Sequence, residues 1–485
     1  MRREIAIGVA AATCIALGSY GAGATRNRSG IMRDLGLDPL MYGHGRGLME
    51  ACLTIGIIGL VVAWLMLGRA RPGLSAARRA TWAWTAPLVF SAPILSRDVY
   101  SYLMQGAMLR DGYDPYTEGA AVNPGPYLWE VSHDWRNTTT PYGPAHLGLG
   151  KAITTVVGDD VTAGLIAYKL VSLLGFAMLV WAVPRIAAAL GADPAYALWI
   201  GAANPLMLLH LVGGMHNEAV MVGLVSVGLL ACIAPQRRRF LWASAGIALI
   251  ALAVSLKATA AIALPFVVWI MYARYAKGSW PRRLGVFTGC GAWALALTIA
   301  VVDLVTVVSG ASWGWIAEIS GNSKVVNPLA GPTFLAEVLT PIAQLVNENF
   351  HYNTALAATR AASSAVMLAG LVVAWWYFRP RGENSPARAV AGTTAAYAVA
   401  FVANAVTLPW YYASLLSLVG TFRTPAWVQQ VAVAASVVVA LAFTGSGNHR
   451  FYDPWFLILA PFIGLFAVAF VWPRKVPVAG VCGLR

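Results

Sequence analysis

Long apolar segments separated by short clusters of arginine and lysine limit what this chain can fold into. Residues 81–95 contain no charged side chain and follow the basic segment 69–79, and comparable apolar segments recur along the chain. Hydrophobic residues make up 59% of the 485 residues and charged residues only 11%, which is more apolar surface than a soluble core of this size buries. We therefore predict an all-α polytopic membrane protein, a single transmembrane domain over residues 1–485 with about 13–14 spans.

The basic clusters predict which way these spans run. Cytoplasmic loops of membrane proteins carry an excess of lysine and arginine. Counting spans in order puts a set of basic segments on that side, namely 69–79, 235–240, 274–283, 379–388 and 473–475. The net charge of +14 is thereby explained by topology, and the scattered clusters lack the basic, aromatic-rich face of a nucleic-acid binder. We expect a multi-pass protein of the plasma membrane that binds the lipid bilayer and no nucleic acid.

Two segments fit this scheme less well than the others. The apolar run up to about residue 24 can be read as a signal peptide or as a first span, and a second apolar run that follows closely favours a span. Residues 410–422 are apolar but short for a helix that crosses the bilayer.

Two long loops face the opposite, extracytoplasmic side. Residues 97–160 are rich in acidic side chains, whereas residues 309–353 hold several aromatic residues and Gly-Pro turns. Loops of this length in a compact protein are usually functional or disordered, and their aromatic and apolar content argues against disorder. We expect helices lying along the interface in these loops, and a cavity beneath them.

Asp98 stands where an uncharged span ends. The residues after it interleave apolar and polar side chains at roughly helical spacing, as in a helix that lies along the interface. This position holds a carboxylate where lipid meets water. Two interpretations remain open: a catalytic carboxylate, or an N-terminal cap of the interfacial helix, which is a frequent role for aspartate.

Other polar and aromatic residues are predicted to reach the same face. His216, Asn217 and Glu218 form a predicted hairpin between two spans, and Lys257 lies at the next outer turn. Charges at such positions are costly unless they are paired or functional. The alternatives are a hydrogen-bonded turn residue for His216, snorkelling to the interface for Lys257, and an aromatic belt for residues 410–412.

The order of these motifs resembles a known superfamily. SRDVYSY (96–102), GYDPY (112–116) and PYGP (141–144) look like the first extracytoplasmic loop of the GT-C glycosyltransferases. GGMHNE (213–218) and LPWYY (408–412) look more narrowly like the actinobacterial polyprenol-phosphomannose-dependent α-(1→6)-mannosyltransferases, which elongate the mannan backbone of lipomannan and lipoarabinomannan. Of the two branches of that family, called A and B, the chain length favours A.

The resemblance implies an inverting enzyme. Its donor would be polyprenyl-phosphate-mannose, its acceptor a mannoside glycolipid, and its general base Asp98, with no metal or other cofactor. The implied contacts to the donor phosphate and lipid are Lys257, His216, Asn217 and Arg97. The implied contacts to the acceptor sugar are Tyr102, Asp114, Tyr142, Glu218, Trp410 and Tyr411.

Other functions remain open at this point. A lipid or glycan transporter or flippase also has many spans, but such proteins more often carry charges toward the midplane and internal repeats. Here the charges collect at one face and no repeat is visible. A GT-C enzyme that uses another lipid-linked sugar, and a non-catalytic scaffold that binds lipid-linked glycans, are the further alternatives.

Overall fold

The computed structural model describes residues 1–473 except 29, 235–236, 322–324 and 383–384. Its described part is all-helical, and its only β-type pairing there is one isolated bridge between Phe443 and His449. The predicted all-α class is confirmed. Apolar helices dominate because residues that are hydrophobic over a length comparable to the bilayer must satisfy their backbone polar groups internally.

Eight helices of the described part are long and apolar enough to cross a membrane. They are α1 (Arg2–Ala22), α3 (Gly43–Arg69), α8 (Val161–Ala189), α12 (Arg239–Leu256), η5 with α13 (Ala258–Tyr275), α14 (Trp280–Ser309), α17 (Tyr352–Tyr377) and α21 (Pro454–Val471). The pair Pro194–Gly201 and Pro205–Gly213 adds a ninth if it is counted as one span bent by 52°. It comprises α9 (Pro194–Gly201), α10 (Pro205–Met207) and the π-helix η4 (Leu208–Gly213).

This number is smaller than the predicted 13–14 spans because several apolar segments form shorter or less apolar helices. They are α4 (Leu74–Val89), α11 (Glu218–Ile233), α18 (Ser385–Ala403), α19 (Ala413–Val419) and α20 (Ala426–Ala442). The segment 410–422, predicted as a short span, folds instead as the end of the 3₁₀ turn η6 (Pro409–Tyr412) followed by α19, which has seven residues. Its apolar composition reflects burial inside the protein, since α19 is buried along almost its whole length.

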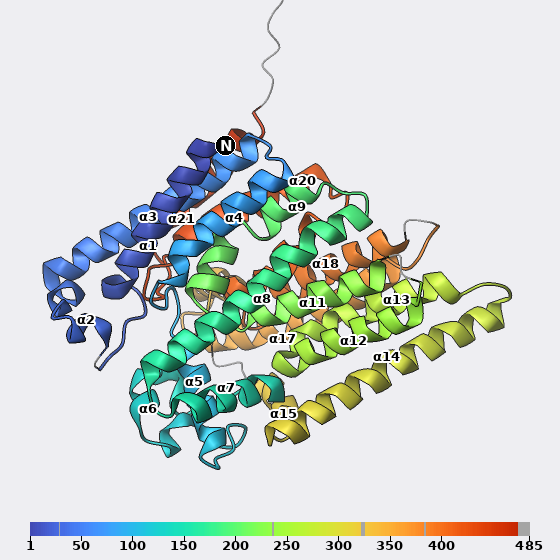
Figure 1. The fold of residues 1–485 in the computed structure, drawn as a ribbon, viewed down its shortest axis with the longest axis horizontal. Helices are drawn as coiled ribbons and strands as arrows, with labels where there is room; N and C mark the ends of the chain where they lie inside the picture. Colours follow the sequence, from blue (N-terminus) through green and yellow to red (C-terminus); the bar gives the residue numbers. More distant parts are fainter. Residues whose placement is uncertain (29, 235–236, 322–324, 383–384, 474–485) are drawn as a thin grey trace, which may run out of the picture.

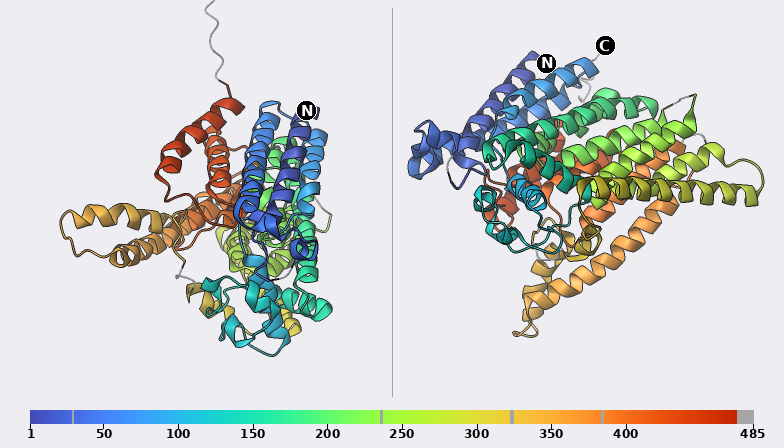
Figure 2. Two further views of the ribbon diagram at one scale, coloured as in Figure 1. Left: turned by 90° about the vertical axis from the view of Figure 1, so that its left-hand side faces the viewer. Right: turned by 60° about the horizontal axis from the view of Figure 1, so that its bottom comes forward.

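The helices pack into a layered bundle. Figure 1 shows α1, α3 and α4 side by side near the N-terminus, and α8, α11, α12, α13 and α14 following one another across the molecule. Figure 2 shows α17 and α16 (Gly331–Gln344) forming a hairpin that projects from this body. The N-terminus and the basic turn after Arg69 lie together at the top of Figure 1.

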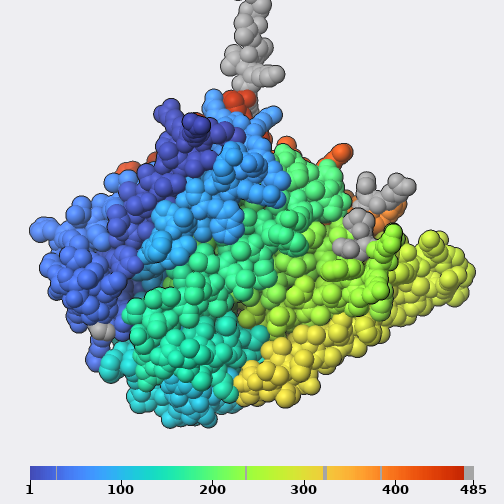
Figure 3. Space-filling view, viewed as in Figure 1, coloured from blue at the N-terminus to red at the C-terminus, as the bar shows by residue number. Residues whose placement is uncertain are grey.

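The loop 97–160 folds into a cluster of short helices at the opposite end. It contains α5 (Asp98–Arg110), η2 (Ala120–Val122), α6 (Pro126–Glu130), η3 (His133–Trp135) and α7 (Pro144–Val157). Figure 3 shows this cluster as a rounded projection in contact with one end of α14. The second long loop contributes α15 (Trp315–Gly321) beside it.

Helix α5 is held tightly within this cluster. A Cβ atom added at Gly106 of α5 would lie 2.2 Å from the backbone of Gly150 of α7, so the two helices cross where neither has a side chain. Val99, Leu103 and Met104 are fully buried in the small core that this crossing creates. The helix therefore lies in the expected loop but is enclosed by protein on most sides, which fixes its first residue, Asp98.

Candidate active site

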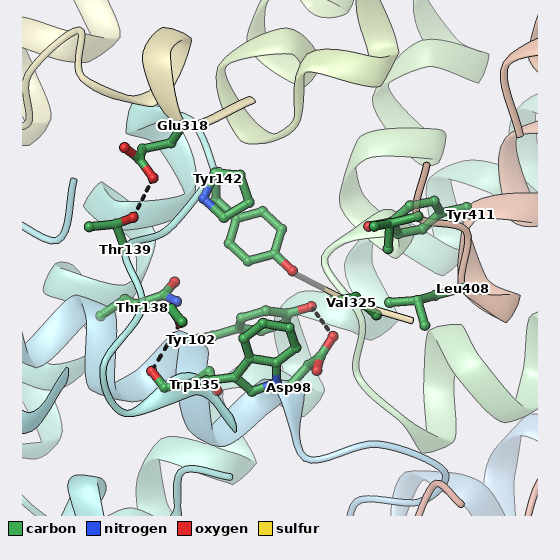
Figure 4. A pocket seen from close by; sticks show the side chains of 14 residues that line it. Asp98, Tyr102, Trp135, Thr138, Thr139, Tyr142, Glu318, Val325, Leu408 and Tyr411 are labelled. Carbon is green, nitrogen blue, oxygen red and sulfur yellow. Dashed lines mark hydrogen bonds between the residues drawn. The ribbon is translucent and has the colours of Figure 1, made fainter. Parts of the chain in front are cut away.

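Asp98 is the first residue of α5 and lines a cavity. The cavity walls come from α5, from residues 135–142, from Glu318 of α15 and from residues 406–411 (Figure 4). The Asp98 side chain is 17% exposed. The carboxylate of Asp98 is therefore accessible from this cavity.

Strained backbone brings Asp98 and His216 together. Leu95, three residues before Asp98, has φ 64°, and Met215, directly before His216, has φ 55°. Residues other than glycine adopt this left-handed region at a cost, and such residues cluster at functional sites. The π-helix η4 that leads into Met215 is a second irregularity often found at such sites. As a result, His216 Nδ1 lies 3.5 Å from Asp98 Oδ2.

Neighbouring side chains keep Asp98 ionised. Burial acts to raise the pKa of the Asp98 carboxyl, but His216, the Ser96 hydroxyl and the charge of Lys257 outweigh burial and hold the pKa below its usual value. The hydroxyl of Tyr102 also donates toward Asp98 Oδ2, at 3.5 Å. At neutral pH the carboxylate is therefore unprotonated, which is the form that can accept a proton.

Lys257 and Glu218 form a buried ion pair beside the cavity. Lys257 lies at the junction of α12 and η5 and donates to Glu218 Oε1. Its Nζ is 3.9 Å from the ring centroid of Tyr411 and 5.5 Å from that of Tyr142. A buried ion pair is costly unless it is well compensated, and the two aromatic faces supply part of that compensation. The site thus holds a fixed positive charge close to Asp98.

His146, which sequence reasoning missed, packs against the rings of Tyr102 and Tyr142. Its ring centroid is 4.6 Å from that of Tyr102 and 4.5 Å from that of Tyr142, and its Nδ1 lies 3.3 Å from Asn217 Nδ2. Burial, with a smaller contribution from Lys257, lowers the pKa of His146 to about 3, so this imidazole is neutral. Its position two residues after the PYGP turn was the available signal.

Most residues that the sequence singled out meet here. Figure 4 shows Asp98, Tyr102, Tyr142 and Tyr411 around one cavity. Trp410 does not line this cavity, and its ring stacks on His216. Glu218, predicted to contact the acceptor, forms an ion pair with Lys257.

Arg97 and Asp114 do not reach the cavity. The Arg97 guanidinium donates to the backbone oxygens of Thr25 and Glu130 and to the Glu130 carboxylate, which directs it into a separate pocket. Asp114 accepts from the backbone N–H of Tyr116 and stabilises its own turn. Both have local structural partners, although their positions within the motifs suggested ligand contacts.

Lys169 is a second residue that sequence reasoning missed. Its ammonium, in α8, is buried and donates to the backbone oxygen of Val212 at 2.8 Å and to that of Leu88 at 3.2 Å. Leu88 belongs to the end of α4, which leads to Asp98, and Val212 to η4, which leads to His216. One lysine side chain therefore connects both irregular segments. A single lysine in the middle of an apolar span was the signal.

The arrangement supports proton transfer and anion stabilisation. It combines an ionised carboxylate, a buried ammonium, two imidazoles and several aromatic faces. In the part of the chain that the structure describes, no group of three or more His, Cys, Asp or Glu side chains is placed to hold a metal ion.

Comparison with known proteins identifies the family. Residues 5–273, more than half of the chain, match the sequence model described as alpha-(1->6)-mannopyranosyltransferase, N-terminal domain. The chain belongs to the alpha-(1->6)-mannopyranosyltransferase family. Residues 332–472 of this family member also match the model described as MptB C-terminal domain. Asp98, His216 and Lys257 lie in the first match and Tyr411 in the second, whereas Glu318 lies between them.

Several alpha-(1->6)-mannopyranosyltransferases resemble the chain over most of its length. Alpha-(1->6)-mannopyranosyltransferase A of Corynebacterium glutamicum is 54% identical, covering 95% of this chain and 96% of its own. The A enzyme of Mycobacterium tuberculosis is 38% identical, covering 92% of this chain and 85% of its own. The B enzyme of C. glutamicum is 30% identical, covering 84% of this chain and 70% of its own. These identities agree with the predicted A branch. No solved structure matches the chain significantly.

Proposed function

We propose that this protein transfers mannose from polyprenyl-phosphate-mannose to a hydroxyl of a mannoside glycolipid. The product is an α-(1→6) linkage in the mannan backbone of lipomannan and lipoarabinomannan. The names of the relatives support mannosyl transfer. The lipid-linked donor is supported by a carboxylate and an ammonium beside one cavity, in a chain whose described part holds eight helices long and apolar enough to cross a membrane.

Asp98 acts as the general base of a single displacement. The acceptor hydroxyl attacks the anomeric carbon, the bond from that carbon to the phosphate oxygen breaks, and the hydroxyl proton passes to Asp98. General-base assistance of this kind contributes roughly 10²–10⁴-fold to the rate. Attack on the face opposite the phosphate inverts the anomeric configuration, so a β-linked donor yields an α-linked product without a covalent enzyme intermediate.

Lys257 stabilises the phosphate that leaves. Its ammonium has three donors, and Glu218 is the one side chain within the described residues that forms an ion pair with it. The remaining donors can bind phosphate oxygens, where a charge-assisted contact strengthens as the leaving group gains charge. His216 and Asn217, on the adjoining hairpin, are the further donors that we assign to the phosphate.

We propose that this transfer needs no metal and that it occurs on the extracytoplasmic side of the plasma membrane. Lys257 supplies the positive charge that a divalent cation would otherwise provide. The orientation is supported by Figure 1, in which α5–α7 lie at the end of the bundle away from the N-terminus and the basic turn after Arg69. Full transfer in the presence of a chelator is the expected outcome of the metal test.

The observation that carries the proposal is an ionised Asp98 carboxylate lining a cavity beside Lys257. Purified Asp98→Asn protein should bind the donor but transfer no mannose, because the amide keeps the shape and loses the proton acceptor. Asp111→Asn is a matched control in the same loop, since Asp111 pairs with Arg110 and does not line the cavity.

The result that contradicts the proposal is near-normal transfer by Asp98→Asn together with normal transfer by the control. Asp98 would then serve only as a helix-terminal residue. A parallel series of polyprenyl-phosphate donors carrying other hexoses tests the alternative donor sugars, with transfer from polyprenyl-phosphate-mannose expected to be fastest.

A further inference from the structure

One face of α5 carries a line of polar side chains that begins at Asp98. Asp98, Ser101, Tyr102 and Gln105 all line the cavity, and their spacing of three, four and seven residues places them on one side of the helix. From Asp98 to Gln105 the helix rises about 10 Å. This polar face therefore continues well beyond the carboxylate where the proposed reaction occurs.

Two polar atoms on this face are unpaired. Ser101 Oγ and Gln105 Oε1 are buried and find no hydrogen-bonding partner among the described residues. Buried polar groups are nearly always hydrogen-bonded, and each exception calls for an explanation. Because both residues line the cavity, a ligand with several hydroxyl groups is a suitable partner for them.

The second long loop supplies a wall that also presents polar groups. Glu318 of α15 lines the same cavity and accepts a hydrogen bond from Thr139 of the first loop, so the two loops meet here. Figure 4 shows Glu318 on a different side of the cavity from Asp98, with Tyr142 and Tyr102 between them. Trp135 lines the cavity as well, and an indole ring offers an apolar face to the C–H groups of a pyranose.

We propose that Ser101, Gln105, Trp135 and Glu318 form a subsite for the acceptor sugars that precede the reacting mannose. The inference rests on the proposed mannosyl transfer. When the 6-hydroxyl of the terminal mannose lies at Asp98, the rest of the acceptor must extend away from Asp98. The polar face of α5 offers it unpaired hydrogen-bonding groups along one such direction. The ligand class is a linear oligosaccharide of at least two hexoses, recognised through its hydroxyl groups.

Variants that remove only the polar atoms test this subsite. Ser101→Ala and Gln105→Met delete groups that lack protein partners, so the midpoint of thermal unfolding should stay the same or rise. The KM for an α-(1→6)-mannotrioside should nevertheless increase about three- to tenfold per variant, which corresponds to the loss of one or two hydrogen bonds. The KM for the donor should not change. Glu318→Gln should act in the same direction on the acceptor.

Acceptor length makes the test sharper. Methyl α-mannoside lacks the preceding sugars, so these variants should reduce its kcat/KM less than that of the trioside. Gln344→Met is the control, because Gln344 lies on α16 and its amide donates to the backbone oxygen of Phe350 outside the cavity. This variant should leave both KM values unchanged.

Direct binding separates failure of the subsite from failure of the proposed function. Saturation-transfer NMR with α-(1→6)-mannotriose should give a signal for the wild-type protein that is reduced in the Ser101→Ala/Gln105→Met double variant, whether or not transfer is detected. Equal signals for both proteins, or equal losses of kcat/KM for the monosaccharide and the trioside, would overturn the subsite. Absence of mannosyl transfer by the wild type would overturn the proposed function alone.

Discussion

His216 and Trp410 stack with ring centroids 3.6 Å apart and an interplanar angle of 17°. The two residues come from separate family matches, and their stack joins the N-terminal and C-terminal parts of the chain at the site. His216 Nδ1 also lies 3.5 Å from Asp98 Oδ2, so the indole ring packs against the imidazole that faces the carboxylate. This relationship leads to the first prediction.

Trp410→Leu should lower kcat about tenfold or more and should also raise the donor KM, because we assign His216 to the donor phosphate. The substitution keeps an apolar side chain but removes the flat surface against His216, and an aromatic pair of this kind contributes about 0.5–1.5 kcal/mol beyond burial. Trp410→Tyr is the control and should retain most activity because a ring remains. Initial rates at saturating donor and acceptor decide between the two. Equal rates for the two variants would show that stacking has no part in positioning His216.

The pH dependence of kcat/KM should report the ionisation of the Asp98 carboxyl. Since the pKa of its carboxyl lies below the usual value, the wild-type rate should fall only as the pH drops below the ordinary aspartate range near about 4. In His216→Gln the effect of burial, which raises the pKa, is less strongly opposed, so the acidic limb should move to higher pH. The Asp98 carboxyl also affects stability. Because its pKa is lower in the folded than in the unfolded state, its ionisation stabilises the fold at any pH above the pKa of the unfolded state. This contribution is lost as the pH falls through the pKa of the folded state.

The test is a pH–rate profile measured for both proteins over the range in which they remain folded. An acidic limb at the same pH in His216→Gln and wild type would show that the imidazole does not influence Asp98.

Variants of the Lys257–Glu218 pair should affect stability and donor binding differently. Removing one partner leaves a buried charge uncompensated, which typically costs about 3–5 kcal/mol, whereas removing both costs much less. Lys257→Met should therefore lower the unfolding midpoint, and Lys257→Met/Glu218→Leu should restore most of it. Donor affinity should stay low in both variants because both lack the ammonium that we assign to the phosphate. Recovery of donor binding in the double variant would show that Lys257 acts only on stability.

Lys169→Met should disrupt the site from a distance. It removes the hydrogen bonds from Lys169 to the backbone oxygens of Leu88 and Val212, and one intramolecular hydrogen bond contributes roughly 0.5–1.5 kcal/mol. We expect a lower unfolding midpoint and a large loss of kcat. Lys169→Arg should recover part of both because it keeps a charge and several donors. Lys151→Met is the matched control, since Lys151 makes one contact to Ser309 at a partly exposed position.

Membrane topology allowed much of this site to be predicted. Asp98, His216, Lys257 and Tyr411 were placed at one face because each follows or precedes an apolar segment at the same end of the bundle, and the structure brings them together. The spacing of apolar segments could not reveal how many of them cross the bilayer. Helices buried among other helices are as hydrophobic as those that contact lipid, and α11 is an example.

The remaining site residues depend on contacts that no local pattern encodes. Arg97 adjoins Asp98 in sequence, yet its guanidinium turns to Glu130, because the backbone oxygen and the carboxylate of Glu130 both accept hydrogen bonds from it. Glu318 belongs to a loop with few charges, and only the meeting of the two loops brings it to Thr139. The role of Lys169 could not be predicted because it depends on the backbone oxygens that lie beside its ammonium in the folded chain, such as that of Val212.

The position of Glu318 between the two matched segments has an evolutionary consequence. The stretch between residues 273 and 332 belongs to neither match, yet it supplies part of the cavity wall far along the chain from Asp98. Under the proposed acceptor subsite, mutations there should alter which glycans are accepted while Asp98 and its neighbours stay untouched. Two descendants of one ancestral gene can therefore diverge in the length of polymer that they extend through changes in this connecting stretch alone.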